Sequence, residues 1–139
     1  MRMLKIEKKV VESLIAHAQK DYPIEACGYL AQRDGVVVSA FPLTNTDASV
    51  DHFTLDPQEQ FSAVKKMRSL GLTLKGVYHS HPVTPARPSQ EDIRLAYDPD
   101  LSYVIISLAD GSEVVKSFRI VKGSVQEEPV TVLTSAEEI

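Results

Sequence analysis

Two histidines and a nearby carboxylate are the residues of this chain whose types and spacing most directly suggest chemistry. His79 and His81 lie two residues apart at the end of an apolar run, and Pro82 follows them. Ser89 and Asp92 come a few residues later, where a helix is expected to begin. Two imidazoles and one carboxylate are a common ligand set for a catalytic zinc ion, which keeps its fourth position open for water. The segment therefore predicts a metal-dependent hydrolase.

The residues before the histidines are expected to place both rings on one side of a strand. Residues 73–78 are mostly β-forming side chains and follow Gly71, which signals the end of a helix. Residues i and i+2 of an extended chain point to the same side, so His79 and His81 can converge on one ion. Pro82 marks the end of the strand, because proline cannot donate to a sheet ladder.

The carboxylate can reach the histidines across a stiff loop. Residues 83–88 separate the strand from a helix predicted from Gln90 to about Tyr97. This loop is long enough for the chain to fold back and bring Asp92 next to the two rings. A simpler interpretation is that Ser89 is only the N-cap of the helix and Asp92 completes a capping box. The two interpretations are compatible, since one carboxylate can serve both roles.

The motif matches that of a known family. The pattern His-x-His-Pro, six residues, Ser, two residues and Asp is met without deviation by His79, His81, Pro82, Ser89 and Asp92. It resembles the JAMM motif of the MPN+ (JAB) metalloproteases. The segment Pro23-Ile24-Glu25-Ala26-Cys27-Gly28 is similar to the Pro-x-Glu-x-Cys-Gly opening of the stand-alone prokaryotic members. The resemblance covers nearly the whole chain, from about Leu4 to Ile120.

The resemblance implies a role for each motif residue. His79, His81 and Asp92 would hold one Zn²⁺ per chain, which lowers the pKa of bound water to about 7. Glu25 would be the general base that takes the proton of this water and passes it to the leaving amine. Ser89 would donate a hydrogen bond to the oxyanion of the substrate. Without the resemblance, the simpler interpretation of Glu25 is a surface residue in a turn after Pro23.

The resemblance also implies a substrate. Stand-alone prokaryotic members are associated with small ubiquitin-like sulfur carriers and cut after a C-terminal Gly-Gly, so a sulfur-carrier protein is the expected partner. Three alternatives remain open. One is another zinc peptidase on the same fold, such as a peptidoglycan or phage-tail peptidase. A second is a RadC-like protein, although residues 83–85 depart from its Ser-Gly-Asp continuation. The third is a non-catalytic MPN scaffold, which usually lacks the metal ligands.

The remaining segments predict a single α+β domain, and the resemblance specifies a cytidine-deaminase-like MPN/JAB fold with a mixed sheet flanked by helices. The domain is expected over residues 1–133, with a short acidic tail over 134–139. Apolar periodicity and turn residues predict two helices, from Glu7 to Lys20 and from Asp56 to Gly71. They also predict further strands over residues 27–32, 36–43, 52–55, 102–108, 113–121 and 125–133.

Composition limits the partners. The net charge of -4 offers no basic surface for a nucleic acid. No apolar run approaches the length of a membrane span, and no apolar segment follows the basic N-terminus as it would in a signal peptide. We therefore expect a cytoplasmic protein that is monomeric or a weak homodimer.

Cys27 is the single cysteine, so no internal disulfide is possible. It is expected to be a buried structural residue, although a thiol close to the metal is the alternative. His17 and His52 are expected to lie outside the metal site.

Overall fold

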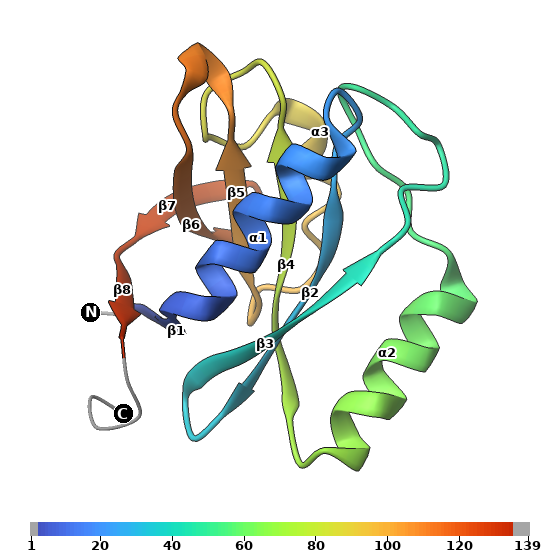
Figure 1. The fold of residues 1–139 in the computed structure, drawn as a ribbon, viewed down its shortest axis with the longest axis vertical. Helices are drawn as coiled ribbons and strands as arrows, with labels where there is room; N and C mark the ends of the chain where they lie inside the picture. The colour runs from blue at the N-terminus through green and yellow to red at the C-terminus, as the bar shows by residue number, and fades with distance from the viewer. Residues whose placement is uncertain (1–2, 135–139) are drawn as a thin grey trace.

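The computed structural model describes residues 3–134, so all but the first residue of the predicted tail, 134–139, lies outside this range. One mixed sheet of eight strands has the order β7-β6-β5-β4-β2-β3-β1-β8 (Figure 1). The strands are β1 (Leu4–Glu7), β2 (Cys27–Arg33), β3 (Val36–Leu43), β4 (Thr73–His81), β5 (Ser102–Ser107), β6 (Val114–Val121), β7 (Ser124–Glu128) and β8 (Val130–Leu133). The helices are α1 (Lys8–Asp21), α2 (Pro57–Ser69) and α3 (Gln90–Arg94), with a 3-10 turn at Ala109–Gly111. The predicted α+β class is confirmed.

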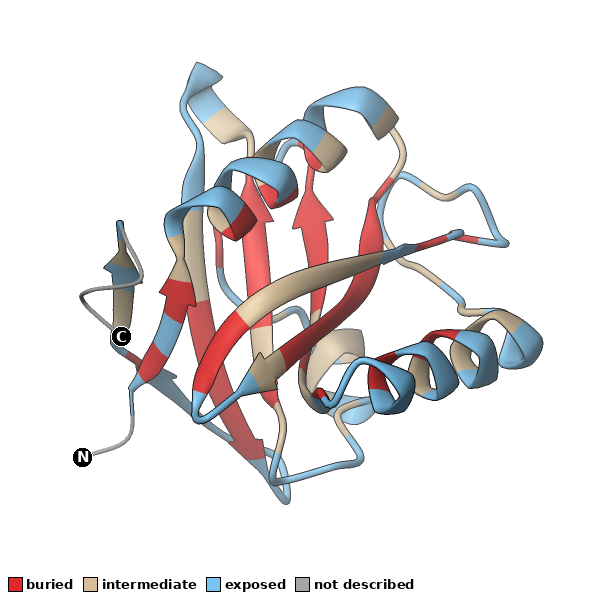
Figure 2. Cartoon of the chain, turned by 60° about the horizontal axis from the view of Figure 1, so that its bottom comes forward, coloured by how far each residue is buried: buried red, intermediate tan, exposed pale blue. Residues whose placement is uncertain are grey.

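The helices cover the two faces of the sheet. Helix α1 packs Val10, Leu14 and Ala18 against one face, on which Tyr78 is buried. Helix α2 packs Ala63 and Met67 against the other face, and α3 lies on that same face. Figure 2 shows the buried residues gathered in the central strands and on the inner sides of the helices. No helix in the described part of the chain is long and apolar enough to span a membrane.

The start of α2 follows its sequence signals. Asp56 is the N-cap, and its side chain accepts a hydrogen bond from the backbone of Gln58 at 3.3 Å. Pro57 occupies the first turn, where its missing N–H leaves no bond unmade. Gly71 follows the helix with a φ of 73°, a conformation that glycine adopts without strain. The predicted helix is therefore confirmed at both ends.

Three predicted elements differ from the structure. Residues 52–55 form no strand, because the backbone of Thr54 is bonded to Asn45 and Thr46 within their own loop. The helix after Ser89 ends at Arg94, earlier than expected. The C-terminal strand is divided at Pro129, which has no N–H to continue the ladder.

The division at Pro129 has a topological consequence. Strand β7 pairs with β6 at one end of the sheet, whereas β8 pairs in parallel with β1 at the other end. The short strand β1 was not predicted. A single residue separates β7 from β8, so the two ends of the sheet approach each other and the sheet is strongly curled. Strand β4, which carries the histidine pair, lies in the middle between β2 and β5.

Candidate metal centre

The histidine pair ends the central strand. His79 and His81 are the final alternate residues of β4, and each is 5% exposed. Strand β2 pairs with β4 as far as His79, and β5 pairs with it as far as His81. Because side chains alternate along a strand, both rings share the face that carries α2 and α3. The predicted strand and the orientation of the two rings are confirmed.

Asp92 reaches the histidines from the first turn of α3. Its backbone N–H donates to Ser89 Oγ at 3.0 Å, and its Oδ2 accepts from the backbone N–H of Ser89 at 2.9 Å. These two bonds form the predicted capping box. The same Oδ2 lies 3.2 Å from His79 Nε2 and 3.1 Å from His81 Nε2. The helix cap therefore fixes the carboxylate against both rings.

The three side chains form a group that could hold a metal ion. His79 Nε2 and His81 Nε2 lie 3.1 Å apart, and each is at a similar distance from Asp92 Oδ2. Ligand atoms bound to one zinc ion at 2.0–2.2 Å in a tetrahedral arrangement lie about 3.3 Å apart. Among the described residues, these three make the one group of His, Cys, Asp and Glu donors compact enough for an ion.

A hydrogen bond to the ring of His81 also favours the binding of a cation by this ring. His81 Nδ1 lies 2.9 Å from the carbonyl oxygen of Pro85, an acceptor to which only an N–H can donate. In its neutral form, His81 would keep its proton on Nδ1 and turn the lone pair of Nε2 toward the site, as binding of a cation requires. The loop over residues 83–88 thus orients the ring of His81 in addition to connecting two elements.

The charged forms of Asp92 and His81 stabilise each other. Burial on its own would raise the pKa of Asp92, but hydrogen bonds to His79 and His81 outweigh it and hold that pKa well below its ordinary value. Burial would likewise lower the pKa of His81, but its hydrogen bond to Asp92 leaves that pKa raised. The aspartate is therefore a carboxylate at neutral pH, as a metal ligand must be.

Glu25 is buried beside this group. It precedes β2 and is 3% exposed, which contradicts the alternative of a surface residue in a turn. Its Oε1 is buried and has no hydrogen-bond partner among the described residues. Burial raises the pKa of Glu25 to about 8, while the charges of His81 and Asp92 act on it in opposite directions. A carboxyl group with an unused buried oxygen next to a metal site can exchange a proton with a water molecule there.

Ser89 stands at the edge of the site and is exposed. Its Oγ accepts from Asp92 N, so the hydroxyl proton is not used in that bond. Since a hydroxyl group both donates and accepts, Ser89 can cap the helix and still donate to a bound ligand.

The other predicted residues lie outside the group. Cys27 is fully buried, its Sγ lies 3.8 Å from the carbonyl oxygen of Leu43, and burial raises the pKa of its thiol to about 12. A neutral buried thiol agrees with the structural role that was expected. His52 is bonded to Asp47 and Asp51 on the neighbouring loop.

His17 lies on the opposite face of the sheet. Its Nδ1 is 2.7 Å from the hydroxyl group of Tyr78, and its Nε2 is 3.1 Å from Asp21 Oδ2. The Tyr78 ring crosses Gly28, where a Cβ atom would lie 2.5 Å from it. This close contact gives the glycine of the Pro-x-Glu-x-Cys-Gly segment a structural reason.

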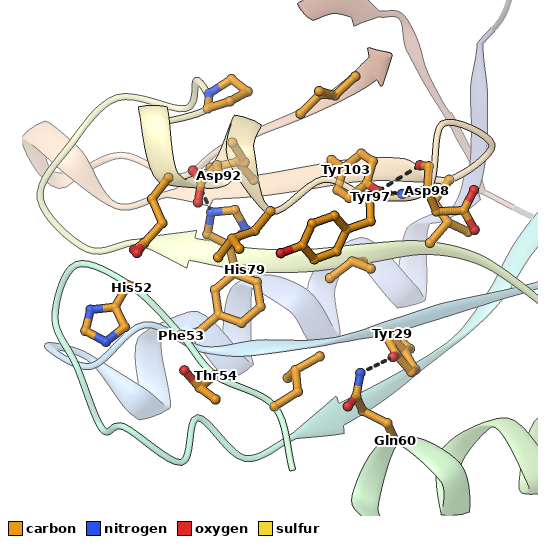
Figure 3. A pocket seen from close by; sticks show the side chains of 18 residues that line it. Tyr29, His52, Phe53, Thr54, Gln60, His79, Asp92, Tyr97, Asp98 and Tyr103 are labelled. Carbon is orange, nitrogen blue, oxygen red and sulfur yellow. Dashed lines mark hydrogen bonds and ion pairs between the residues drawn. The ribbon is translucent and has the colours of Figure 1, made fainter. Parts of the chain in front are cut away.

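Sequence patterns missed two residues that touch the site. The ring centroids of Phe53 and His79 lie 4.9 Å apart, and Phe53 covers His79 from the side of the neighbouring loop (Figure 3). Asn45 donates from Nδ2 to the carbonyl oxygen of Glu25 at 3.1 Å. Both belong to the loop between β3 and α2, and the sequence carried no signal for their contacts beyond the polar character of that loop.

A cleft of about 490 Å³ begins at His79 and Asp92. One wall is the segment His52–Leu55, and the other is formed by α3 and the residues that follow it (Figure 3). Most of its lining is apolar or aromatic, including Phe53, Leu55, Leu95, Tyr97, Leu101 and Tyr103. The site therefore opens into a largely apolar cleft.

The chain belongs to the prokaryotic homologs of the JAB domain, because that family's model matches residues 7–121. It is 39% identical over 134 residues to the CysO-cysteine peptidase of Mycobacterium tuberculosis, covering 94% of this chain and 92% of that protein. It is 33% identical over 122 residues to a protein of Thermus thermophilus named as a probable TtuB-protein conjugate cleaving protease, covering 87% and 78%.

Solved structures share the fold, among them a JAB1/MPN domain protein from Archaeoglobus fulgidus, which superposes with a TM-score of 0.64 at 22% identity over 94% of this chain and 100% of that one. A protein from Desulfitobacterium hafniense superposes with a TM-score of 0.88 at 49% identity, over 98% of this chain and 97% of that one. The predicted JAB-type fold is confirmed, and so is the prediction of a JAMM-type peptidase at the level of its class.

Proposed function

We propose that this protein is a zinc-dependent peptidase that hydrolyses the bond after the C-terminal Gly-Gly of a small ubiquitin-like sulfur carrier. The observation that carries the proposal is the convergence of His79 Nε2, His81 Nε2 and Asp92 Oδ2 within 3.2 Å of one another, beside the buried carboxyl of Glu25. The names of the relatives from Mycobacterium tuberculosis and Thermus thermophilus support hydrolysis of carrier conjugates.

One zinc ion per chain would be held by His79, His81 and Asp92, with the fourth position open. When bound, zinc acidifies a water molecule and polarises the carbonyl group of the substrate. The protein contributes fixed ligand geometry, since β4 holds the histidines and the capping box of α3 holds the carboxylate.

Glu25 is the proton carrier in this proposal. Burial raises the pKa of Glu25 to about 8 in the metal-free protein, and a bound cation would lower it, which favours the carboxylate that a general base requires. A group of this kind can accept a proton from the attacking water and return it to the departing amine. Its unpaired Oε1 leaves it free to do so without breaking a bond within the protein.

Ser89 acts on the substrate carbonyl. Its hydroxyl proton can be donated to the carbonyl oxygen as negative charge develops there, because Oγ uses only a lone pair in the bond from Asp92 N. Removing one such donor in other hydrolases costs about 2.7–4 kcal/mol of transition-state stabilisation.

The cleft suits the tail of a carrier protein. Glycine has no side chain, so two glycines can lie close to the metal between Phe53 and the start of α3. The apolar walls beyond them can contact the residues that adjoin the Gly-Gly pair.

The test uses a sulfur carrier that ends in Gly-Gly and carries a short C-terminal extension, with products identified by mass spectrometry. Zinc-loaded protein is expected to release the extension after Gly-Gly, chelator-treated protein to be inactive, and added zinc to restore activity. Glu25→Gln is the matched control, because it keeps the shape of the side chain and removes its basicity. Equal cleavage of a carrier without Gly-Gly, or by the chelated protein, would contradict the proposal.

A further inference from the structure

We infer that Asn45 is a positioning residue, which ties the general base Glu25 to the wall of the substrate cleft. The inference rests on the proposed function and adds a residue outside the JAMM motif. Asn45 is the second residue of the loop between β3 and α2 and is 9% exposed. Its side chain is bonded on one side to the backbone of Glu25 and on the other to both halves of its own loop.

The position of Glu25 depends on its backbone. Because its buried Oε1 has no hydrogen-bond partner among the described residues, no bond to that oxygen orients the carboxyl. The backbone N–H of Glu25 donates to the carbonyl oxygen of Ser49 at 2.9 Å, and its carbonyl oxygen accepts from Asn45 Nδ2 at 3.1 Å. Both partners belong to the β3–α2 loop, so this loop fixes where the carboxyl can lie.

The same amide organises the loop. Asn45 Nδ2 also donates to the carbonyl oxygen of His52 at 3.0 Å and lies 3.4 Å from that of Ser49. Its Oδ1 accepts from the backbone N–H groups of Asp47 and Thr54, both at 3.2 Å. One side chain therefore joins the start of the loop, its middle and its end.

The end of this loop is the cleft wall. The segment His52–Leu55 lines the cleft, and within it Phe53 covers the ring of His79 (Figure 3). Asn45 therefore bonds both to the backbone of Glu25 and to the segment that forms the cleft wall. Asparagine suits this position because its amide combines two donors with an acceptor, whereas the isosteric aspartate at neutral pH has no donor.

The test compares Asn45→Asp and Asn45→Ala with Thr46→Val. Both substitutions at Asn45 remove the bond to Glu25. Asn45→Asp keeps the shape of the side chain, and Asn45→Ala adds no charge. Thr46→Val removes a different bond in the same loop, from Thr46 Oγ1 to the carbonyl oxygen of Thr54 at 3.0 Å, and leaves Glu25 untouched.

Both Asn45 variants are expected to keep one zinc ion and to lose about 10- to 100-fold in kcat, since proton transfer by a positioned base contributes about 10²- to 10⁴-fold. The KM for a carrier substrate should rise by a smaller factor, because the cleft wall is loosened as well. Thr46→Val should keep the wild-type kcat. A wild-type kcat in both Asn45 variants, or an equal loss in Thr46→Val, would overturn the inference.

A second measurement needs no substrate. Hydrogen exchange of the Glu25 amide, followed by NMR in zinc-loaded protein, should be about tenfold faster in both Asn45 variants, which corresponds to a loss of about 1.4 kcal/mol of local stability. It should be unchanged in Thr46→Val. If the wild type cleaves no carrier but exchange responds in this way, the proposed function fails and the anchoring role of Asn45 stands. Unchanged exchange would reject that role.

Discussion

Ser80 and Ala26 exchange two hydrogen bonds that join the strand of His79 and His81 to the segment carrying Glu25. Ala26 N donates to Ser80 Oγ at 2.8 Å, and Ser80 N donates to the carbonyl oxygen of Ala26 at 2.9 Å. Ser80 lies between His79 and His81 and is fully buried, with its side chain on the opposite face of β4. This contact between their immediate neighbours therefore helps to set the spacing between Glu25 and the histidine pair.

Replacing Ser80 by alanine should lower both stability and activity. The change leaves the buried N–H of Ala26 without its acceptor, which costs about 1–3 kcal/mol. We expect a lower Tm and a reduced kcat with zinc content unchanged, measured by thermal unfolding, steady-state kinetics and metal analysis.

Ser117→Ala is the matched control for this change. It removes the buried bond from Ser117 Oγ to Glu128 Oε1 at 2.7 Å, which lies on β6 and β7 away from the metal centre. Its Tm should fall while its kcat stays at the wild-type value. If the two variants were equally active, the bond between Ser80 and Ala26 would have no part in positioning Glu25.

Substitutions at Ser89 and Asp92 should separate the helix cap from the metal site. Ser89→Ala removes the cap acceptor and should lower the unfolding free energy by about 0.5–2 kcal/mol while zinc stays bound. Asp92→Asn keeps an oxygen that can accept from Ser89 N but loses the charge, so zinc should be lost. Isothermal titration with zinc and chemical denaturation test both expectations, and zinc binding to Asp92→Asn with wild-type affinity would show that Asp92 only caps the helix.

Burial of Glu25 predicts a pH-dependent stability of the metal-free protein. Its pKa is raised from 4.5 to about 8, so between these values the folded state holds a proton that the unfolded state has released. Stability attributable to this group therefore falls as the pH rises from 4.5 to 8. Glu25→Gln should remove this contribution, making the metal-free variant more stable than the wild type at pH 8 and similar to it at pH 4.5.

Thermal unfolding across this range checks the prediction. Zinc should weaken the dependence, because a nearby cation favours the carboxylate. Identical pH profiles for metal-free wild type and Glu25→Gln would mean that the carboxyl is solvated.

Cys27 should resist modification in the folded protein. Its thiol is fully buried and its pKa is raised to about 12, so little reactive thiolate exists at pH 8. Iodoacetamide should label it only after unfolding, as followed by intact-mass spectrometry. Rapid labelling of the native protein, with or without zinc, would contradict the buried structural role.

The parts of the site that were predictable are local in sequence. His79 and His81 follow the two-residue period of a strand, so chain geometry alone places their rings side by side. The Ser89–Asp92 pair follows the spacing of a capping box, so chain geometry also brings these two residues together. Glu25 is distant in sequence, and only the family resemblance assigned it. Its backbone N–H is held by the carbonyl oxygen of Ser49, a contact that no periodicity encodes.

The errors in the fold have physical causes of the same kind. Residues 52–55 look β-forming, but the bonds of Thr54 to Asn45 and Thr46 close a loop instead of joining the sheet. The strand pair β1 and β8 brings together the two ends of the chain, and each strand has only four residues, too few to show a pattern. Asn45 acts through five bonds to backbone groups, which a sequence does not display.

The most direct test of the central claim is the metal content of the folded chain. Native mass spectrometry of protein purified without chelator and offered zinc should give one zinc ion per chain, lost on chelation and absent from Asp92→Asn and from His79→Ala. A folded wild-type chain that takes up no zinc, or one that binds it equally well in both variants, would contradict the assignment of His79, His81 and Asp92 as the metal ligands.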